Sequence, residues 1–335
     1  MTRALWFTAP RTAELREEAV REPEAGEVQV QALCSLVSAG TEMNVYRGQV
    51  GSAAEVALPT VAGEFPFPIK YGYQVVGRVV VAGDASGYET GDRVFCQHPH
   101  QERFTVDARV PIVFPLPPAV PVLTAAFSSL YRTALNCLLD VPVRVGECVA
   151  VSGLGVVGSF CAHLARKTAG RLLLIDPAPR RRELAAWIGA DAVVAPDEAP
   201  AAVAELSDGR GMDVIIEASG APAALQAALR SIATEGTIAA VAWYGTREVP
   251  LVLTPEFHFR RPRIISSWVG MIGSGQQARW TPERQRAVAL AGVGEIDVER
   301  LVTQRFAFAD APQAYELIDQ HPEETLGVVL DYEEG

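Results

Sequence analysis

The sequence predicts an α/β protein whose central part is a doubly wound parallel sheet. From residue 147 onward, short β-branched runs alternate with alanine-rich segments of helical length, a pattern typical of parallel strands joined by crossover helices. Within this region, Val149–Asp176 has the form of a strand, a glycine-rich turn, a helix and a second strand. The first 120 residues or so differ, because short strand-like runs there are separated by glycine, proline and aspartate, which predicts a β-rich part.

The alternating region divides into expected elements by its apolar runs and breakers. The expected strands are Cys148–Ser152, Arg171–Asp176, Ala192–Ala195, Asp213–Glu217, Thr237–Ala242 and, at the end, Ile264–Val269. The expected helices are Val156–Thr168, Pro179–Ile188, Ala199–Leu206 and Pro222–Ala233.

The flanking regions give shorter and less regular patterns. Before the alternating region, strands are expected at Glu27–Ala32, Gly77–Ala82, Arg93–Cys96 and Arg103–Val106, followed by a proline-rich boundary at Pro111–Pro121 and a helix at Thr124–Leu139. After it come the segments Pro282–Ala291 and Ala311–Asp319 and a terminal strand, Gly327–Tyr332.

Length and composition exclude several classes of protein. A chain of 335 residues suits about two domains. The net charge of −11 argues against nucleic-acid and anionic-membrane partners. No apolar run approaches the roughly 20 residues that span a bilayer, and no signal peptide is recognised, so a cytoplasmic protein is expected. Five cysteines without a CxxC pair indicate buried thiols rather than a zinc ribbon or a redox dithiol.

The turn after the first strand of this region carries a dinucleotide-binding fingerprint. It reads Gly153-Leu154-Gly155-Val156-Val157-Gly158, in which the glycines allow a tight turn, close approach of the pyrophosphate and packing of the helix on the strand. Asp176, which closes the next strand, is expected to bind the adenosine ribose and to favour NAD over NADP. The expected cofactor-binding set is completed by Arg181, Ser219 and Trp243.

Two further segments resemble the medium-chain dehydrogenase/reductase superfamily, and the likeness extends over nearly the whole chain. Residues 38–48, SAGTEMNVYRG, look like its CGTD segment with the following YRG, and residues 70–77, KYGYQVVG, with GDRV at 91–94, look like its GHE and GDRV segments. The resemblance implies a GroES-like β-barrel catalytic domain, residues 1–122 plus 271–335, into which a Rossmann NAD-binding domain, residues 123–270, is inserted. It also implies a homodimer, or a larger oligomer built from such dimers, formed through the last sheet strand.

The chain departs from the zinc-dependent members of this superfamily at the positions of the metal ligands. The CGTD cysteine is matched by Ala39, the GHE histidine and glutamate are matched by Tyr73 and Gln74, and the third ligand position falls near Ala126. A catalytic zinc needs about three protein ligands, so no metal site and no zinc are expected. In this respect the motifs are similar to those of bacteriochlorophyllide (hydroxyethyl) dehydrogenase-like proteins.

Polar side chains must then manage the proton that accompanies hydride transfer. The expected catalytic residues are Tyr73, Thr41, whose counterpart in the family touches the substrate oxygen, and His98, since histidine suits proton transfer near neutral pH. The expected substrate-binding residues are Glu42, His100, Tyr244 and His258. Each could instead be structural: Tyr73 could fill the space of the metal, and the histidines could lie in a surface loop or the core.

These expectations define a leading function and two alternatives. The leading hypothesis is a zinc-independent NAD(P)-dependent oxidoreductase that acts on an alcohol or ketone of a small biosynthetic molecule. One alternative is an NAD(P)H-dependent double-bond reductase of the enoyl or quinone type. The other is a catalytically silent dinucleotide-binding protein.

Overall fold

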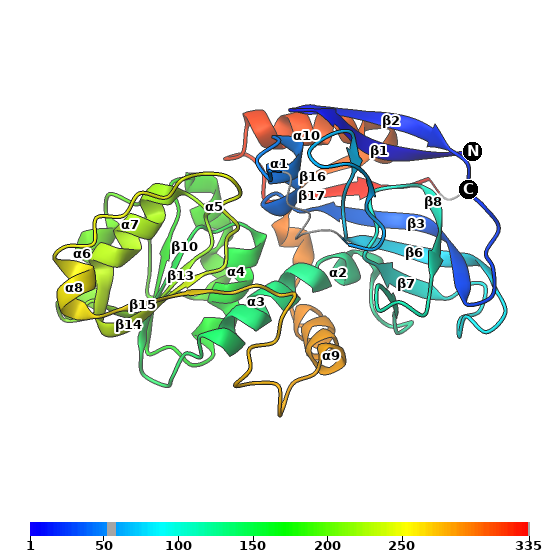
Figure 1. The fold of residues 1–335 in the computed structure, drawn as a ribbon. Helices are drawn as coiled ribbons and strands as arrows, with labels where there is room; N and C mark the ends of the chain where they lie inside the picture. Colours follow the sequence, from blue (N-terminus) through cyan, green and yellow to red (C-terminus); the bar gives the residue numbers. More distant parts are fainter. Residues whose placement is uncertain (52–57, 334–335) are drawn as a thin grey trace. The chain divides into compact units, whose positions relative to one another are not determined.

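The computed structural model describes residues 1–51 and 58–333, and the chain divides into two compact units (Figure 1). Unit 1 contains residues 1–127 and 293–335, and unit 2 contains residues 128–292. Residues 271–292, which were expected in the first domain, pack with unit 2 instead. The reason is that Gln285, on helix α9 (Pro282–Val293), hydrogen-bonds Arg132 and Asn136 of helix α3 (Ser128–Asp140).

Unit 2 contains the predicted doubly wound sheet. Its strands are all parallel and lie in the order β12-β11-β10-β13-β14-β15, so the chain winds outward in both directions from the neighbouring strands β10 and β13. The strands are β10 (Cys148–Ser152), β11 (Arg171–Ile175), β12 (Ala192–Val194), β13 (Met212–Glu217), β14 (Ile232–Ala240) and β15 (Arg263–Ser266).

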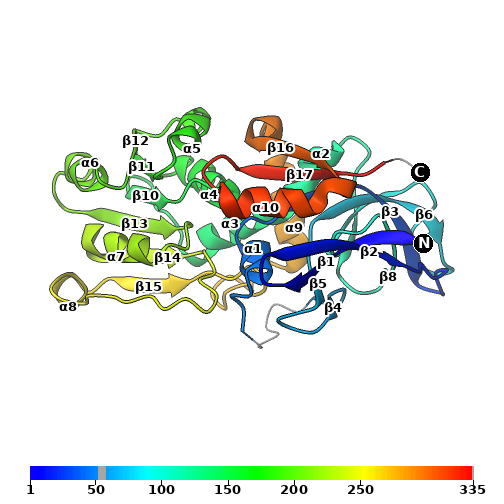
Figure 2. The same ribbon diagram turned by 90° about the horizontal axis from the view of Figure 1, so that it is seen from above.

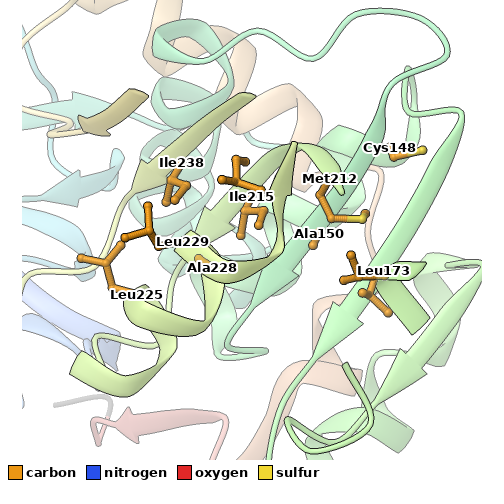
Figure 3. Packing of buried hydrophobic residues seen from close by; sticks show 11 residues of the cluster. Cys148, Ala150, Leu173, Met212, Ile215, Leu225, Ala228, Leu229 and Ile238 are labelled. Carbon is orange, nitrogen blue, oxygen red and sulfur yellow. The ribbon is translucent and has the colours of Figure 1, made fainter. Parts of the chain in front are cut away.

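Helices cover this sheet, and apolar side chains fill the space between the layers. The helices of unit 2 are α3, α4 (Val156–Arg166), α5 (Pro179–Leu184), the 3-10 turn η1 (Ala186–Ile188), α6 (Ala199–Leu206), α7 (Pro222–Ser231), α8 (Glu256–Arg260) and α9, which packs on α3. Proline opens several of them, because the first helical position needs no amide hydrogen. Figure 3 shows one buried cluster, in which Ile215 and Ile238 of the sheet pack with Leu229 of α7.

Unit 1 is built from both ends of the chain, as the resemblance implies. The C-terminal strand β17 (Gly327–Asp331) pairs antiparallel with β3 (Glu27–Val37) and parallel with β16 (Val302–Ala307), and Figures 1 and 2 show β3 and β17 side by side. The larger sheet continues through β6 (Val75–Ala82), β7 (Arg93–Cys96) and β9 (Val113–Pro115), while β8 (Arg103–Asp107) pairs with β3.

A second, smaller sheet and several short helices complete unit 1. The sheet contains β1 (Thr2–Ala9), β2 (Thr12–Glu18), β4 (Ala62–Gly63) and β5 (Ile69–Lys70). The helices are α1 (Thr41–Tyr46), α2 (Val122–Ala126), η2 (Val298–Leu301), η3 (Phe308–Asp310) and α10 (Ala311–Gln320). Strands β1, β2 and β16 were not predicted, and the single helix expected at Thr124–Leu139 is divided between α2 and α3.

Candidate active site

The glycine-rich turn of unit 2 is shaped by close packing at two of its glycines. A Cβ atom on Gly158 would lie 1.8 Å from the Gly153 carbonyl oxygen, and one on Gly153, whose φ is +93°, would lie 2.6 Å from the Ser219 amide nitrogen. Gly155, which precedes helix α4, is different, because a Cβ atom there would meet nothing within 4 Å. The turn therefore offers open space directly in front of a helix N-terminus, where free amide groups favour a phosphate.

Asp176 directly follows strand β11 and is almost fully buried. One carboxylate oxygen accepts a hydrogen bond from the Leu154 amide at 2.7 Å, and the other accepts one from the Ala178 amide at 2.8 Å. The Arg181 guanidinium lies 4.0 Å from the same carboxylate. Asp176 thus holds the glycine-rich turn itself, and its contact with a cofactor ribose stays a prediction.

A second buried carboxylate, Glu217, lies at the carboxyl end of β13 and was not predicted. Its oxygens accept hydrogen bonds from the Ser219 amide and hydroxyl, from the Gly220 amide and from the Tyr244 hydroxyl. Burial, followed by the bond to Glu217, raises the pKa of Tyr244. The hydroxyl of Tyr244, a residue expected to bind substrate, therefore donates its hydrogen bond to Glu217 within unit 2. A sequence signal existed, since an acidic residue directly follows the apolar run Val214–Ile216.

In unit 1, Tyr73 lies among hydroxyl groups of the segment that leads into helix α1. Its phenol donates a hydrogen bond to Ser38 Oγ at 2.6 Å and also bonds the Thr41 side chain. Burial and the nearby Glu42 carboxylate raise the pKa of Tyr73 to about 12, although the bonds to Ser38 and Thr41 lower it. Near neutral pH the phenol therefore keeps its proton and acts as a hydrogen-bond donor.

Glu42 and His100 are fully buried and hydrogen-bonded to each other. Glu42 Oε2 lies 2.9 Å from His100 Nε2 and accepts a hydrogen bond of 2.5 Å from the Tyr315 hydroxyl, whereas Glu42 Oε1 has no hydrogen-bond partner in the described part of the chain. His100 Nδ1 lies 2.7 Å from Ser35 Oγ. Both side chains were expected to bind substrate, but their atoms are enclosed within unit 1, so they act as a buried network instead.

Comparisons with known proteins agree with this fold. Residues 156–285 match the family model described as zinc-binding dehydrogenase. D-guloside 3-dehydrogenase of Escherichia coli strain K12 is 29% identical over 95% of this chain and 97% of its own length. L-threonine 3-dehydrogenase of Pyrococcus horikoshii is 26% identical over 91% and 92%. The chain is an NAD(P)-dependent dehydrogenase/reductase.

A solved structure supports the fold of the dehydrogenase. A short chain alcohol dehydrogenase from E. coli CFT073, complexed with NADH, superposes with a TM-score of 0.76 at 18% identity and covers 98% of this chain and 99% of that one. In the described part of the dehydrogenase, no helix combines the length and apolar character that a membrane span requires. The five cysteines are buried free thiols, as expected.

Two histidines of the dehydrogenase lie away from any expected chemistry. The His98 ring stacks on Phe104 with ring centroids 3.7 Å apart, its Nδ1 lies 2.8 Å from the Pro99 carbonyl oxygen, and burial lowers its pKa to about 3. His98 is therefore neutral near pH 7 and does not offer the imidazolium that an acid would need, and its expected part in proton transfer stays a prediction. His258 is exposed on α8, whose Arg260 bonds the Ile232 carbonyl at the amino end of β14, so it lies far from the sheet edge that binds ligands.

The residues at the positions that the resemblance assigns to metal ligands have other side chains and other partners. Ala39 and Ala126 have no ligand atom, the Tyr73 hydroxyl is bonded to Ser38, and the buried Gln74 amide donates to the Leu36 carbonyl. Among the residues that the structure describes, one group of histidine and acidic side chains is close enough to share an ion, and it is the exposed trio His321, Glu323 and Glu324. These donors do not fit the buried three-ligand centre of a catalytic zinc.

Proposed function

We propose that this dehydrogenase works without zinc and transfers a hydride between NAD and an alcohol or ketone carbon of a small biosynthetic molecule. The observation that carries the proposal is the cluster of Tyr73, Ser38 and Thr41 hydroxyls at the position of a metal ligand. The named relatives support the substrate class, since they are dehydrogenases of a guloside and of threonine.

The name of the matching family does not itself argue for zinc. The matched segment, residues 156–285, lies within unit 2. The positions that correspond to metal ligands, 39, 73 and near 126, lie outside that segment and carry alanine, tyrosine and alanine. The match therefore supports the nucleotide-binding part of the enzyme and leaves the metal to be decided by the side chains of unit 1.

The nucleotide fits the chemistry of unit 2. The residues proposed to hold it are the turn Gly153–Gly158, Asp176, Arg181, Ser219 and Trp243. Open space at Gly155 suits a pyrophosphate, and the Asp176 carboxylate would repel a 2′-phosphate, which favours NAD over NADP. Arg181, 4.0 Å from Asp176, partly offsets that repulsion.

The task of unit 1 is to stabilise the charge on the substrate oxygen. When bound, the cofactor supplies or accepts the hydride. In the reducing direction, electrons of the carbonyl double bond move to its oxygen, which needs a nearby donor. The neutral Tyr73 phenol can turn from Ser38 to that oxygen and give it a hydrogen bond or its proton. The Ser38 and Thr41 hydroxyls can then donate to the phenolic oxygen, so a chain of hydroxyls replaces the metal.

We also propose that the enzyme forms a homodimer through strand β15. This strand is an edge of its sheet, and Ile264 and Trp268, on and beside it, are exposed apolar side chains. Continuing the sheet into a second copy would satisfy the open edge and bury both. Light scattering on Trp268→Glu should show monomers where the wild-type protein shows dimers, and a monomeric wild type would refute the proposal.

One experiment tests the zinc-free mechanism. Purified protein is analysed for metals, assayed for NAD(H)-dependent turnover on a panel of secondary alcohols and ketones with and without chelator, and compared with Tyr73→Phe. We expect less than stoichiometric zinc, activity that survives chelation, and a kcat reduced about 10²-fold in the variant, the lower range for loss of a general acid. The control variant is Thr12→Ala, on the surface strand β2, which should keep full activity.

Each outcome separates one hypothesis from another. One zinc per chain whose removal abolishes activity would overturn the zinc-free proposal. Full activity of Tyr73→Phe would remove Tyr73 from the chemistry. Consumption of NADH with enones but not with ketones would favour the double-bond reductase instead.

A further inference from the structure

A buried carboxylate stands at the point where the unit 2 sheet reverses its winding. Glu217 is the last residue of β13 and pairs in register with Ser152, the last residue of β10. The chain winds outward in opposite directions from these two strands, and ligands of such sheets bind beyond the carboxyl ends of the strands there. The Glu217 side chain has no exposed surface, so it acts on a ligand through its neighbours.

Both oxygens of Glu217 are occupied by donors from two loops. Oε1 accepts from the Ser219 amide at 2.8 Å and the Gly220 amide at 3.1 Å, and also from the Ser219 hydroxyl. Oε2 accepts from the Tyr244 hydroxyl. Hydrogen bonds to an ionised acceptor are about twice as strong as neutral ones. The carboxylate therefore joins the loop after β13 to the loop after β14, both at the sheet edge that binds ligands.

The loop after β13, which Glu217 holds through Ser219 and Gly220, also packs against the glycine-rich turn. The Ser219 amide nitrogen lies 2.6 Å, and the Ala218 Cβ 3.3 Å, from where side chains on Gly153 and Gly158 would begin. These contacts leave no room for the loop to move toward the turn. A change in the position of Ser219 is therefore passed directly to the backbone that leads into helix α4.

We propose that Glu217 is a positioning residue for the nucleotide. Its carboxylate fixes the Ser219 loop and Tyr244 and thereby holds the glycine-rich turn in the geometry that binds the cofactor. This inference rests on the cofactor site proposed above and adds a residue that does not touch the cofactor. A side chain that only stabilised unit 2 would affect the folding of the protein but not the affinity of the folded protein for NADH.

The test compares three variants of the full chain by NADH fluorescence titration and by thermal unfolding without cofactor. Glu217→Gln keeps the size of the side chain but turns an amide toward the amide and hydroxyl donors. We expect its Kd for NADH to rise about tenfold, the ratio that corresponds to 1.4 kcal/mol. Tyr244→Phe removes one donor, and a rise of roughly threefold is expected, since a single hydrogen bond contributes about 0.5–1.5 kcal/mol.

The control is Glu205→Gln, the same substitution at an exposed position of α6, and its Kd should equal that of the wild type. A Glu217→Gln protein with a lower melting temperature but an unchanged Kd would overturn the inference while leaving the cofactor site intact. If Glu217→Gln does not fold, a Tyr244→Phe protein with an unchanged Kd for NADH would overturn the inference equally. Wild-type protein that does not bind NADH would instead refute the cofactor site itself.

Discussion

Lowering the pH from 7 to 5 should destabilise the wild-type protein more than a His98→Asn variant. Burial against Phe104 lowers the pKa of His98 to about 3, whereas an unfolded histidine titrates near 6.5. Between these values the unfolded chain binds a proton that the native protein does not, so stability falls as the pH falls from about 6.5 toward about 3. Asparagine retains a hydrogen-bond donor but cannot titrate.

The size of the effect follows from the two pKa values. A pH of 5 lies about 1.5 units below the pKa of the unfolded histidine. Each unit corresponds to 1.36 kcal/mol, so the free energy of unfolding falls by about 2 kcal/mol. The wild-type protein should therefore lose about 2 kcal/mol more than His98→Asn between pH 7 and pH 5. The carboxylates that titrate in the same range are common to both proteins and cancel in the comparison.

Urea unfolding at both pH values, followed by circular dichroism, measures this difference. A companion NMR titration should show a ring signal, absent from His98→Asn, that does not move between pH 8 and pH 5. Equal pH dependence in the two proteins, or a His98 signal with a midpoint near 6.5, would refute the reasoning. Such a result would also restore His98 as a possible proton-transfer group near neutral pH.

Two further predictions concern the glycine-rich turn and the buried network of unit 1. Gly158→Ala places a Cβ 1.8 Å from the Gly153 carbonyl oxygen and should lower the melting temperature of the protein. Gly155→Ala places its Cβ in open space, so this variant should melt like the wild type but bind NADH more weakly. Equal melting temperatures and equal NADH affinities of the two variants would contradict this prediction. Tyr315→Phe removes a donor from buried Glu42 and should lower the free energy of unfolding by about 1.5–3 kcal/mol, the range for hydrogen bonds to charged groups. Urea titration checks the value, and a change near zero would show that the bond contributes nothing.

Local patterns were sufficient for most of unit 2. Strand β10 and helix α6 have the predicted bounds, because buried parallel strands form continuous apolar runs and their crossover helices begin and end at recognisable residues. The same reasoning missed β1 and β2, whose residues alternate in a pattern interrupted by charged side chains. It also treated Thr124–Leu139 as one helix, although Phe127 separates α2 from α3.

The candidate site was predictable where its parts are close in sequence. The glycine-rich turn and Asp176 belong to one strand–helix–strand unit, so their contact follows from spacing. The functions of individual polar residues did not follow in this way. His98 and His100 are two residues apart, yet one stacks in the core as a neutral ring and the other bonds to Glu42.

The sequence by itself determined the α/β class, the order of the unit 2 elements, the glycine-rich turn and the replacement of the family's cysteine and histidine by Ala39 and Tyr73. These properties depend on residue type and on neighbours within a few turns of the chain. Only the tertiary structure decided that Glu42, His100 and Tyr315 form one buried network and that Glu217 holds Ser219 and Tyr244. The physical reason is that a buried polar group takes whatever partner folding brings to it, and in the Glu42 network these partners come from distant parts of the chain.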